Sequence, residues 1–575
     1  MADSSPYSPP VEDYTFLLGE AFGLDLVDRA TGGELSVDDA TDILAAAGDF
    51  AASVIAPLER TGDQVGARLD DGQVHLPDGF AEAYKAFVDA GWVTAEAPVS
   101  AGGDGLPGGI RAGLSEMWNA SNAAFALCWL LTAGQIHALD AAASDELREI
   151  FLTKLVSGEW TGTMNLTEPE AGTDLGAIRS IATPRDDGSW GIRGQKIFIT
   201  WGDHDIAENI VHLVLARTPG APDGAKGLSL FVVPKFLVDD DGSLGERNAV
   251  TTVAIEHKLG IHGSPTCVLA YEDATGYLVG ELGGGLAGMF IMMNSARAGM
   301  GFQATGIADR SYQEAAAYAA NRLQGRVLDR PAGSSIAEHP DVRRLLLSMS
   351  SKIFAMRALG VYVGDLLDRG ESDEDVNRLG EFFVPILKGW TTEDAIQVTS
   401  EGIQVFGGMG FIEETGVAQH YRDVRITTIY EGTTAIQSND LVGRKVLRDG
   451  GATAEELFTA VEQTVAQLRG VDHPVAARTA DRLARALDAG RRATADLLGF
   501  AESPRDVHAV SVPYLMLLGT LAGGWMHASA VTAVLAKDEQ TTTDAARLTS
   551  ADFYGSHHLS RVHALAETVA GGEID

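Results

Sequence analysis

The chain has 575 residues, too many for a single hydrophobic core, and its length predicts three or four structural units. Hydrophobic residues make up 45% and charged residues 21% of the sequence, which describes a folded globular protein and excludes a disordered one. The 43 basic and 80 acidic residues give a net charge of −37, which opposes binding to nucleic acid and to anionic membranes.

The N-terminal part, up to about residue 160, is predicted to be helical. Residues 36–60 have the apolar spacing of an amphipathic helix, and Ser36 precedes acidic residues as an N-cap residue does. Residues 122–139 are almost entirely apolar and predict a buried helix. The first positive residue is Arg29, so we expect no signal or transit peptide and a cytoplasmic location.

Short β-rich runs alternate with turns from residue 162 to about 280. The runs include SWGIRGQKIFIT, NIVHLVLART, GLSLFVVPKFLV and CVLAYEDATGYLVG, and turns rich in Gly, Asp and Pro separate them. Strands at this spacing, without helices between them, predict an antiparallel barrel or sandwich.

Two further helical blocks follow the β-rich segment, one up to residue 447 and one after the break RDGGAT. The order helical, β, helical, helical predicts an α+β multidomain fold. We expect an N-terminal helical domain, a middle antiparallel β domain, a helical bundle and an additional C-terminal helical domain, with boundaries at 1–161, 162–281, 282–447 and 448–575.

The last block contains a stretch, 507–536, with no formal charge and enough length to cross a bilayer. It also contains Pro513 and several glycines, and it lacks basic flanking clusters. A helix buried inside a bundle is the favoured interpretation, with no stable membrane insertion. Peripheral membrane contact is the alternative.

Several motifs point to chemistry that the sequence does not support. The run GGGLAG at 283–288 fits a dinucleotide-binding fingerprint, but a long helix is predicted after it, where that fold needs a second parallel strand. We therefore expect a hinge there. The sequence has no G-K dipeptide, H-E-x-x-H, G-x-S-x-G or C-x-x-C motif, and its two cysteines, Cys128 and Cys267, lie far apart. Neither a metal site nor a disulfide framework is predicted, and a reducing compartment is expected.

Three stretches suit a flat, phosphorylated cofactor when they are taken together. MNLTEPEAGTDLGAIRS at 164–180 carries hydroxyls and glycine, and GQKIFITWGDHD at 194–205 carries aromatic residues beside a threonine. EGIQVFGGMGF at 401–411 ends in a turn with Gly407, Gly408 and Gly410. Taken singly, each also fits a purely structural interpretation, namely a polar loop, a half-buried strand or a tight helix–helix turn.

In this order, and with IYEGTTAIQ at 429–437 after them, these stretches resemble the acyl-CoA dehydrogenase family over about residues 40–447. The resemblance implies a helical domain, a β domain, a helical bundle and one FAD per subunit. The N-terminal extension, the segment 257–281 and the extra helical block resemble a longer bacterial branch. That branch includes 3-methylmercaptopropionyl-CoA dehydrogenase-like and broad-range fatty acyl-CoA dehydrogenases.

The resemblance also implies roles for individual residues, with Glu431 as the catalytic base and Gly432 leaving room for the thioester. NRLQGR at 321–326 departs from the family's R-x-x-F-G pattern, since Gln324 stands where an aromatic residue is common. The residues implied to bind FAD are Leu166, Thr167, Thr173, Phe198, Thr200 and Arg322, with Gln404, Gly407, Gly408 and Thr433 acting across a subunit interface. Those implied to bind acyl-CoA are Thr173, Asn294, Arg297 and Gly432.

The implied reaction explains why a single carboxylate stands beside a glycine. Oxidation to the trans-2-enoyl-CoA removes a proton from the α-carbon and a hydride from the β-carbon. Hydrogen bonds to the thioester oxygen make the α-proton more acidic, and each donor contributes about 3–4 kcal/mol. Burial of the carboxylate raises its pKa toward the value that the reaction needs. We expect a dehydrogenase of fatty acid β-oxidation that passes electrons to an electron-transfer flavoprotein and forms a homodimer.

Three alternatives use the same fold. An acyl-CoA oxidase has the same base and flavin but passes its electrons to oxygen. A DNA-associated flavoprotein is opposed by the net charge of −37 and by the absence of a basic stripe in 452–575. A nitroalkane oxidase-like enzyme is expected to carry aspartate where this chain has Glu431.

Overall fold

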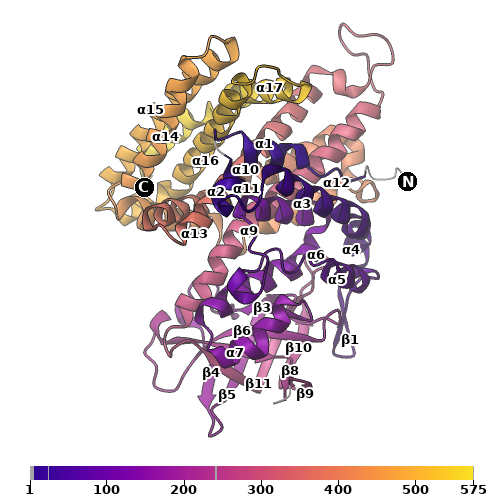
Figure 1. The fold of residues 1–575 in the computed structure, drawn as a ribbon, viewed down its shortest axis with the longest axis vertical. Coiled ribbons are helices and arrows are strands. Elements are labelled where there is room, and N and C mark those ends of the chain that lie inside the picture. Colours follow the sequence, from indigo (N-terminus) through magenta and orange to yellow (C-terminus); the bar gives the residue numbers. More distant parts are fainter. Residues whose placement is uncertain (1–5, 24, 240–241, 574–575) are drawn as a thin grey trace. The chain divides into compact units, whose positions relative to one another are not determined.

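The computed structural model describes residues 6–23, 25–239 and 242–573, which divide into two compact units (Figure 1). The first unit comprises Met1–Ala52, Pro107–Ser121 and Arg297–Asp575, and the second comprises Ser53–Leu106 and Asn122–Ala296. Two long helices, α6 (Gly108–Ala142) and α9 (Gly285–Asn321), contain residues of both units.

The second unit is built on a seven-stranded sheet with the order β10-β11-β5-β4-β6-β3. Strand β7 pairs with both β11 and β6, so the path β11-β5-β4-β6-β7 closes on itself as a barrel does. The pairing is antiparallel except that β6 runs parallel to β3 and to β4. The strands are β3 (Trp160–Asn165), β4 (Ile181–Pro184), β5 (Trp190–Thr200), β6 (Asn209–Arg217), β7 (Leu228–Pro234), β10 (Val250–Ile255) and β11 (Thr266–Val279).

Apolar side chains from several strands of the sheet form the hydrophobic core of this unit. Every residue of β7, and all of β6 except the last, is buried, which matches their continuous apolar sequence. The core includes Ile192, Val214, Phe231, Cys267 and Leu269. The same unit holds the helices α4 (Glu59–Val65), α5 (Phe80–Asp89), α7 (Asp145–Leu147) and α8 (Thr153–Val156), and the strand pair β8 (Phe236–Val238) and β9 (Leu244–Arg247).

A hairpin interrupts the N-terminal part, which the sequence predicted to be helical. Strands β1 (Arg68–Asp70) and β2 (Gln73–His75) pair in antiparallel fashion. The turn between them is Asp71–Gly72, with φ of 46° and 76°. An Asp-Gly pair with both φ angles positive is a preferred two-residue hairpin turn, so the local sequence carried this signal.

The first unit is a helical bundle in which α10 (Pro340–Gly370) packs along α11 (Glu374–Phe406). The N-terminal helices are α1 (Val11–Gly19), α2 (Leu26–Thr31) and α3 (Val37–Phe50). Ser36 is the N-cap of α3, as predicted, and it also forms a capping box with Asp39. The segment after α11 contains the short helices α12 (Val417–Val424) and α13 (Thr434–Asp440).

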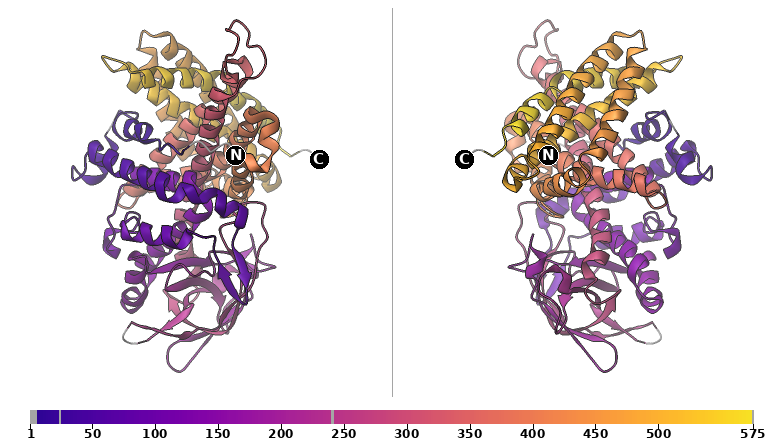
Figure 2. Two further views of the ribbon diagram at one scale, coloured as in Figure 1. Left: turned by 90° about the vertical axis from the view of Figure 1, so that its right-hand side faces the viewer. Right: turned by 90° about the vertical axis from the view of Figure 1, so that its left-hand side faces the viewer.

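The C-terminal block continues the same unit as five helices that pack against one another and against the bundle (Figure 2). Helix α16 contacts both α10 and α11, and its Gly519 lies directly against Trp390 of α11. The five helices are α14 (Ala452–Arg469), α15 (Pro474–Gly499), α16 (Pro504–Leu535), α17 (Thr542–His557) and α18 (Arg561–Ala570).

Four helical segments are long and apolar enough to cross a membrane by length and composition alone, at 37–65, 108–142, 340–370 and 504–535. In α16, 72% of the apolar window is buried inside the protein, as expected for a helix within a bundle. The strands of the sheet lie between Trp160 and Val279, and α9 begins at Gly285. The four domain boundaries drawn from the sequence stay predictions.

Candidate active site

Glu431 lies on a two-residue left-handed turn just before α13. Its φ is 54° and that of Gly432 is 87°. Only glycine adopts such angles at little cost, and a Cβ at Gly432 would also lie 2.7 Å from Nε2 of Gln437. The glycine is therefore required by the turn itself. Thr433 then caps α13, because its hydroxyl oxygen accepts a hydrogen bond from the Ile436 N–H at 3.3 Å.

The carboxyl of Glu431 is placed where its proton is held unusually tightly. Burial raises its pKa from 4.5 to about 7, and the nearby charges of Arg297 and Lys388 act in the opposite direction. Arg297 is on α9 and Lys388 on α11, so two helices carry cations to the base. Burial lowers the pKa of both cations, and the charge of Glu431 opposes that change.

The residue before the base is anchored by a chain of side-chain hydrogen bonds within the first unit. The Tyr430 hydroxyl donates to Oε1 of Gln303 on α9. Nε2 of Gln303 then donates to Oδ1 of Asn119 on α6 at 2.9 Å. Hydrogen bonds thus connect the segment around Tyr430 and Glu431 to the long helices α9 and α6.

In the second unit, the end of β5 presents an aromatic ring. The pairing of β5 with β11 shifts register between Cys267 and Leu269, and Phe198 lies in that bulge with φ of 59°. Its side chain is 58% exposed although it is large and apolar. A bulge that turns a phenylalanine outward fits a surface on which a flat ring packs.

A buried ion pair ties the loop that follows β3 to strand β5. Nζ of Lys196 donates to the Leu166 carbonyl at 2.9 Å and to Oε1 of Glu168 at 2.8 Å, with no exposed surface on the lysine side chain. Glu168 also accepts hydrogen bonds from the Ser180 hydroxyl and from the Arg179 N–H. The loop carrying Thr167 is therefore fixed to β5, and the Ile197 N–H donates to the Thr167 carbonyl at 2.9 Å.

The predicted flavin-binding hydroxyls are available to a ligand. Thr167 and Thr200 are half-buried and Thr173 is exposed, and none of the three hydroxyls has a hydrogen-bond partner within the described residues. A Cβ on the neighbouring Gly172 would meet open space. These hydroxyls suit the oxygen- and nitrogen-rich edge of a flavin, and their contacts with the cofactor stay predictions.

The glycine-rich turn after α11 combines two kinds of glycine. Gly407 ends the helix with φ of 61°, and Gly410 packs so closely on Ile403 that a Cβ would lie 2.3 Å from its carbonyl oxygen. Gly408, in contrast, has open space where a Cβ would lie. Gln404 is exposed one turn earlier. The structural interpretation therefore explains Gly407 and Gly410 but leaves Gly408 to another cause.

The remaining predicted residues are exposed or half-buried. Arg322 follows the end of α9, and its guanidinium forms no ion pair within the described part of the chain. Asn294 is exposed and Arg297 half-buried on α9, one turn apart. The structure thus brings Arg297, Glu431 and Gly432 together in the first unit. Their ligand contacts stay predictions.

Sequence reasoning missed two lysines that this geometry makes prominent, Lys196 and Lys388. Both lie in otherwise apolar runs, GQKIFIT and VPILKGW. A lysine inside an apolar strand or helix is rarely buried unless it has a partner. That pattern was the available signal.

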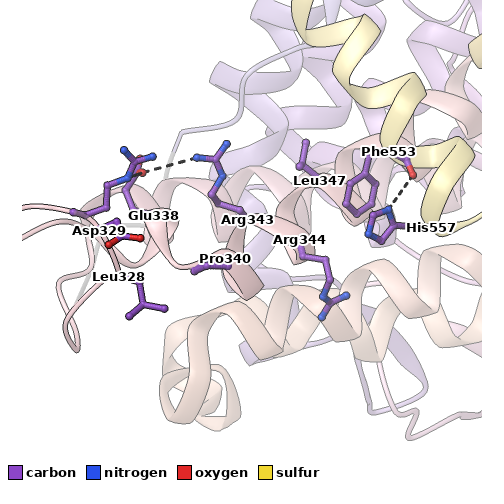
Figure 3. A pocket seen from close by; sticks show the side chains of 10 residues that line it. Leu328, Asp329, Glu338, Pro340, Arg343, Arg344, Leu347, Phe553 and His557 are labelled. Carbon is purple, nitrogen blue, oxygen red and sulfur yellow. Dashed lines mark hydrogen bonds and ion pairs between the residues drawn. The ribbon is translucent and has the colours of Figure 1, made fainter. Parts of the chain in front are cut away.

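The first unit also contains an open cavity of about 640 Å³ that includes none of the predicted site residues (Figure 3). Its guanidinium groups are engaged, since Arg330 and Arg343 pair with Glu338 and Arg344 pairs with Asp341. Across the described residues, no group of three or more His, Cys, Asp or Glu side chains is arranged to hold a metal ion. The cavity therefore contributes no residue to the candidate active site.

Family models match three parts of the chain. Residues 163–274 match "Acyl-CoA dehydrogenase, middle domain", and residues 283–446 match "Acyl-CoA dehydrogenase, C-terminal domain". Residues 457–574 match "Acetyl-CoA dehydrogenase C-terminal like", which covers most of the extra helical block.

Curated relatives are similar over nearly the whole chain. The 3-methylmercaptopropionyl-CoA dehydrogenase of Ruegeria pomeroyi is 48% identical over 565 residues, 96% of each chain. The broad-specificity linear acyl-CoA dehydrogenase FadE5 of Mycobacterium tuberculosis is 35% identical and covers 98% of this chain and 97% of its own.

Solved structures share the fold. The Bacillus anthracis acyl-CoA dehydrogenase complexed with FAD has a TM-score of 0.76 at 22% identity and covers 98% of this chain and 92% of its own. The Caenorhabditis elegans ACDH-11 complex with C11-CoA has the same TM-score at 20% identity, covering 97% of this chain and 93% of its own. The full-length relatives and the matched models together show that this chain belongs to the acyl-CoA dehydrogenase family, a family of FAD-dependent oxidoreductases, as the sequence predicted.

Proposed function

We propose that this chain oxidises an acyl-CoA thioester to the trans-2-enoyl-CoA, with FAD as its cofactor and Glu431 as the base. The observation that carries the proposal is the left-handed turn at Glu431, where burial raises the carboxyl pKa to about 7. A base is most effective when its pKa lies near the working pH. The dehydrogenase relatives support the reaction class.

Two groups of Glu431 act on the substrate. Above its pKa the side chain is a carboxylate and accepts the proton from the α-carbon. Its backbone N–H has no hydrogen-bond partner among the described residues and is free to donate to the thioester oxygen. Such a donor stabilises the charge that develops on that oxygen by about 3–4 kcal/mol.

The second unit offers the groups that would hold the cofactor. FAD, when bound, accepts the hydride from the β-carbon. The hydroxyls of Thr167, Thr173 and Thr200 would hydrogen-bond to its polar edge, and the exposed ring of Phe198 would pack beside it. Asn294 and Arg297 would bind the CoA moiety. Replacing Arg297 with alanine is expected to weaken acyl-CoA binding, and lysine at that position to restore part of it.

The exposed apolar side chains around the glycine-rich turn support a subunit interface. Met409 is 47%, Phe411 89% and Ile412 44% exposed, and large exposed apolar side chains close together in sequence are typical of an interaction site. We propose a homodimer in which Gln404, Gly408 and Thr433 meet the partner subunit's FAD. A tetramer in light scattering would contradict the dimer.

We further propose that the enzyme acts in the cytoplasm, in fatty acid β-oxidation, and passes its electrons to an electron-transfer flavoprotein. The alternative acceptor is oxygen. The two acceptors are distinguished by reducing the enzyme with substrate, admitting air and measuring the rate of flavin reoxidation. Slow reoxidation, much below the turnover rate with an electron-transfer flavoprotein, is expected. Reoxidation at the turnover rate with stoichiometric hydrogen peroxide would identify an oxidase.

The reaction itself is tested with purified holoenzyme mixed anaerobically with a panel of thioesters. The panel contains 3-methylmercaptopropionyl-CoA, butyryl-CoA and longer linear acyl-CoAs, because relatives are named for these substrates. Bleaching of the flavin absorbance with formation of the matching enoyl-CoA is expected for at least one of them. A colourless protein that FAD does not reconstitute, or no bleaching with any thioester, would contradict the proposal.

A further inference from the structure

Lys388 is an unusual residue for the middle of a long helix. It lies on α11 with a side chain that has no exposed surface, and its ammonium donates to the Gly432 carbonyl at 2.7 Å. Burying an ammonium costs several kcal/mol unless it gains strong partners. Its hydrogen-bond acceptor is a backbone carbonyl of the base turn, and no direct ion pair joins it to Glu431 within the described residues.

The base turn is strained, and two side chains hold it in place. A non-glycine residue in the left-handed region costs roughly 1–3 kcal/mol and persists only where its surroundings fix it. Nε2 of Gln437 donates to the Glu431 carbonyl at 3.0 Å, and Nζ of Lys388 donates to the Gly432 carbonyl. Both carbonyl oxygens of the turn therefore accept from side chains that come from α13 and α11.

The charges around the base come from several elements. Arg297 of α9 and Lys388 of α11 both favour the ionised form of Glu431. Glu393 of α11 also acts on Lys388, and its Oε1 accepts from the Thr434 hydroxyl at 2.7 Å. The charges that act on Arg297 are those of Glu431, Asp440 and Arg444, and Tyr430 is the neutral neighbour on the base segment itself.

We propose that Lys388 is a positioning residue for the base: its ammonium fixes the left-handed turn through the Gly432 carbonyl, and its charge favours the carboxylate form of Glu431. The inference rests on the proposed role of Glu431 as the base. It gives Lys388 two separable effects. The hydrogen bond sets where the carboxylate points, and the charge sets the pH at which the carboxylate is ionised.

Three variants separate these effects in the FAD-loaded enzyme. Lys388→Arg keeps the charge and a donor, Lys388→Gln keeps a donor without the charge, and Lys388→Met keeps neither. The measurement is the rate of flavin reduction by a saturating acyl-CoA, and kcat/KM for the same substrate, at closely spaced pH values. The profile of kcat/KM reports the pKa of the base in the free enzyme.

We expect the pH profile of kcat/KM to depend on the charge at position 388. We expect the maximal rate of flavin reduction to depend on the hydrogen bond to the Gly432 carbonyl. Lys388→Gln and Lys388→Met should move the kcat/KM profile upward by about one pH unit, because an opposite charge has been removed near the carboxyl. Lys388→Met should also lower the rate on the high-pH plateau at least tenfold, and Lys388→Arg should keep the wild-type profile. An unchanged profile in Lys388→Gln, or a shifted one in Lys388→Arg, would overturn the proposal.

A matched control distinguishes positioning from general loss of packing. Lys352 is another buried lysine of the same unit, on α10, and its Nζ donates to Oε1 of Gln397 at 3.1 Å. Lys352→Gln should lower the unfolding temperature without moving the pH profile. If Lys388→Met does not fold, the arginine and glutamine variants still decide the question. Failure of the base assignment is recognised separately, since Glu431→Gln would then still reduce its flavin.

Discussion

Replacing Glu431 with glutamine should abolish flavin reduction and, at high pH, stabilise the protein. The amide is nearly isosteric with the carboxyl but cannot accept the α-proton. It also cannot ionise, and ionisation is the state that the folded protein disfavours at this position. Burial raises the pKa of this carboxyl from 4.5 to about 7. Activity and stability should therefore change in opposite directions at one residue.

The size of the stabilisation follows from the pKa. For a carboxyl whose pKa is raised on folding, the folded state holds the proton more tightly than the unfolded state. Below pH 4.5 the carboxyl is protonated in both states and costs the wild-type protein no stability. The free energy of unfolding then falls as the pH rises from 4.5 to about 7, and the contribution of this carboxyl is constant above that range. Each tenfold change in the proton equilibrium is about 1.4 kcal/mol, so the full loss is ~3 kcal/mol.

The assay is calorimetric unfolding of FAD-saturated wild-type and Glu431→Gln proteins from pH 4.5 to pH 8. The two midpoints should coincide at the acid end and separate by roughly 2–5 °C at pH 8, with the variant higher. Glu414→Gln, at an exposed carboxyl of the same unit, is the control and should show no such pH dependence. A difference that is independent of pH, or a less stable Glu431→Gln protein at pH 8, would refute the reasoning.

Three further variants test the supporting structure. Arg357→Met should destabilise the protein by about 3–5 kcal/mol at pH 8, because Arg357 is buried against Glu116, Asp13 and Asp309. Its loss removes a buried charge partner from all three carboxyls, although Asp13 keeps its pair with Arg547. The loss should shrink at acid pH, because burial raises the pKa of Asp309 to about 6 and this carboxyl is then protonated; a larger loss there would contradict the prediction. Gly519→Ala should lower the calorimetric midpoint by an amount equivalent to about 1–3 kcal/mol, because the added Cβ would lie 2.2 Å from the Trp390 ring. An unchanged midpoint would show that α16 and α11 move apart at no cost. Lys196→Met should release FAD during gel filtration, because Glu168 loses its buried partner and the Leu166 loop loses its anchor; full FAD retention would contradict this.

The order of helical and β segments and the family could be read from the sequence alone, and its motifs led to the prediction that Glu431 is the base. Hydrophobic pattern and charge content are local, so the amphipathic helix α3 and the buried part of α16 could be predicted from neighbouring residues alone. The motifs at 164–180 and 429–437 are contiguous, and a contiguous motif is recognisable without coordinates. The hairpin at Asp71–Gly72 was also encoded locally, although its signal was overlooked.

The groups around Glu431 depend on how distant segments pack together. Lys388 and Glu431 are 43 positions apart in sequence, and nothing in a run such as VPILKGW indicates which carbonyl its lysine will reach. Likewise, Lys196 meets Glu168 only because β5 lies against the loop that follows β3. Hydrogen bonds and pKa values depend on distance and burial, which arise when separate segments pack together. The sequence therefore indicates which reaction to expect, and the packing determines the hydrogen bonds and the pKa values of the residues proposed to carry it out.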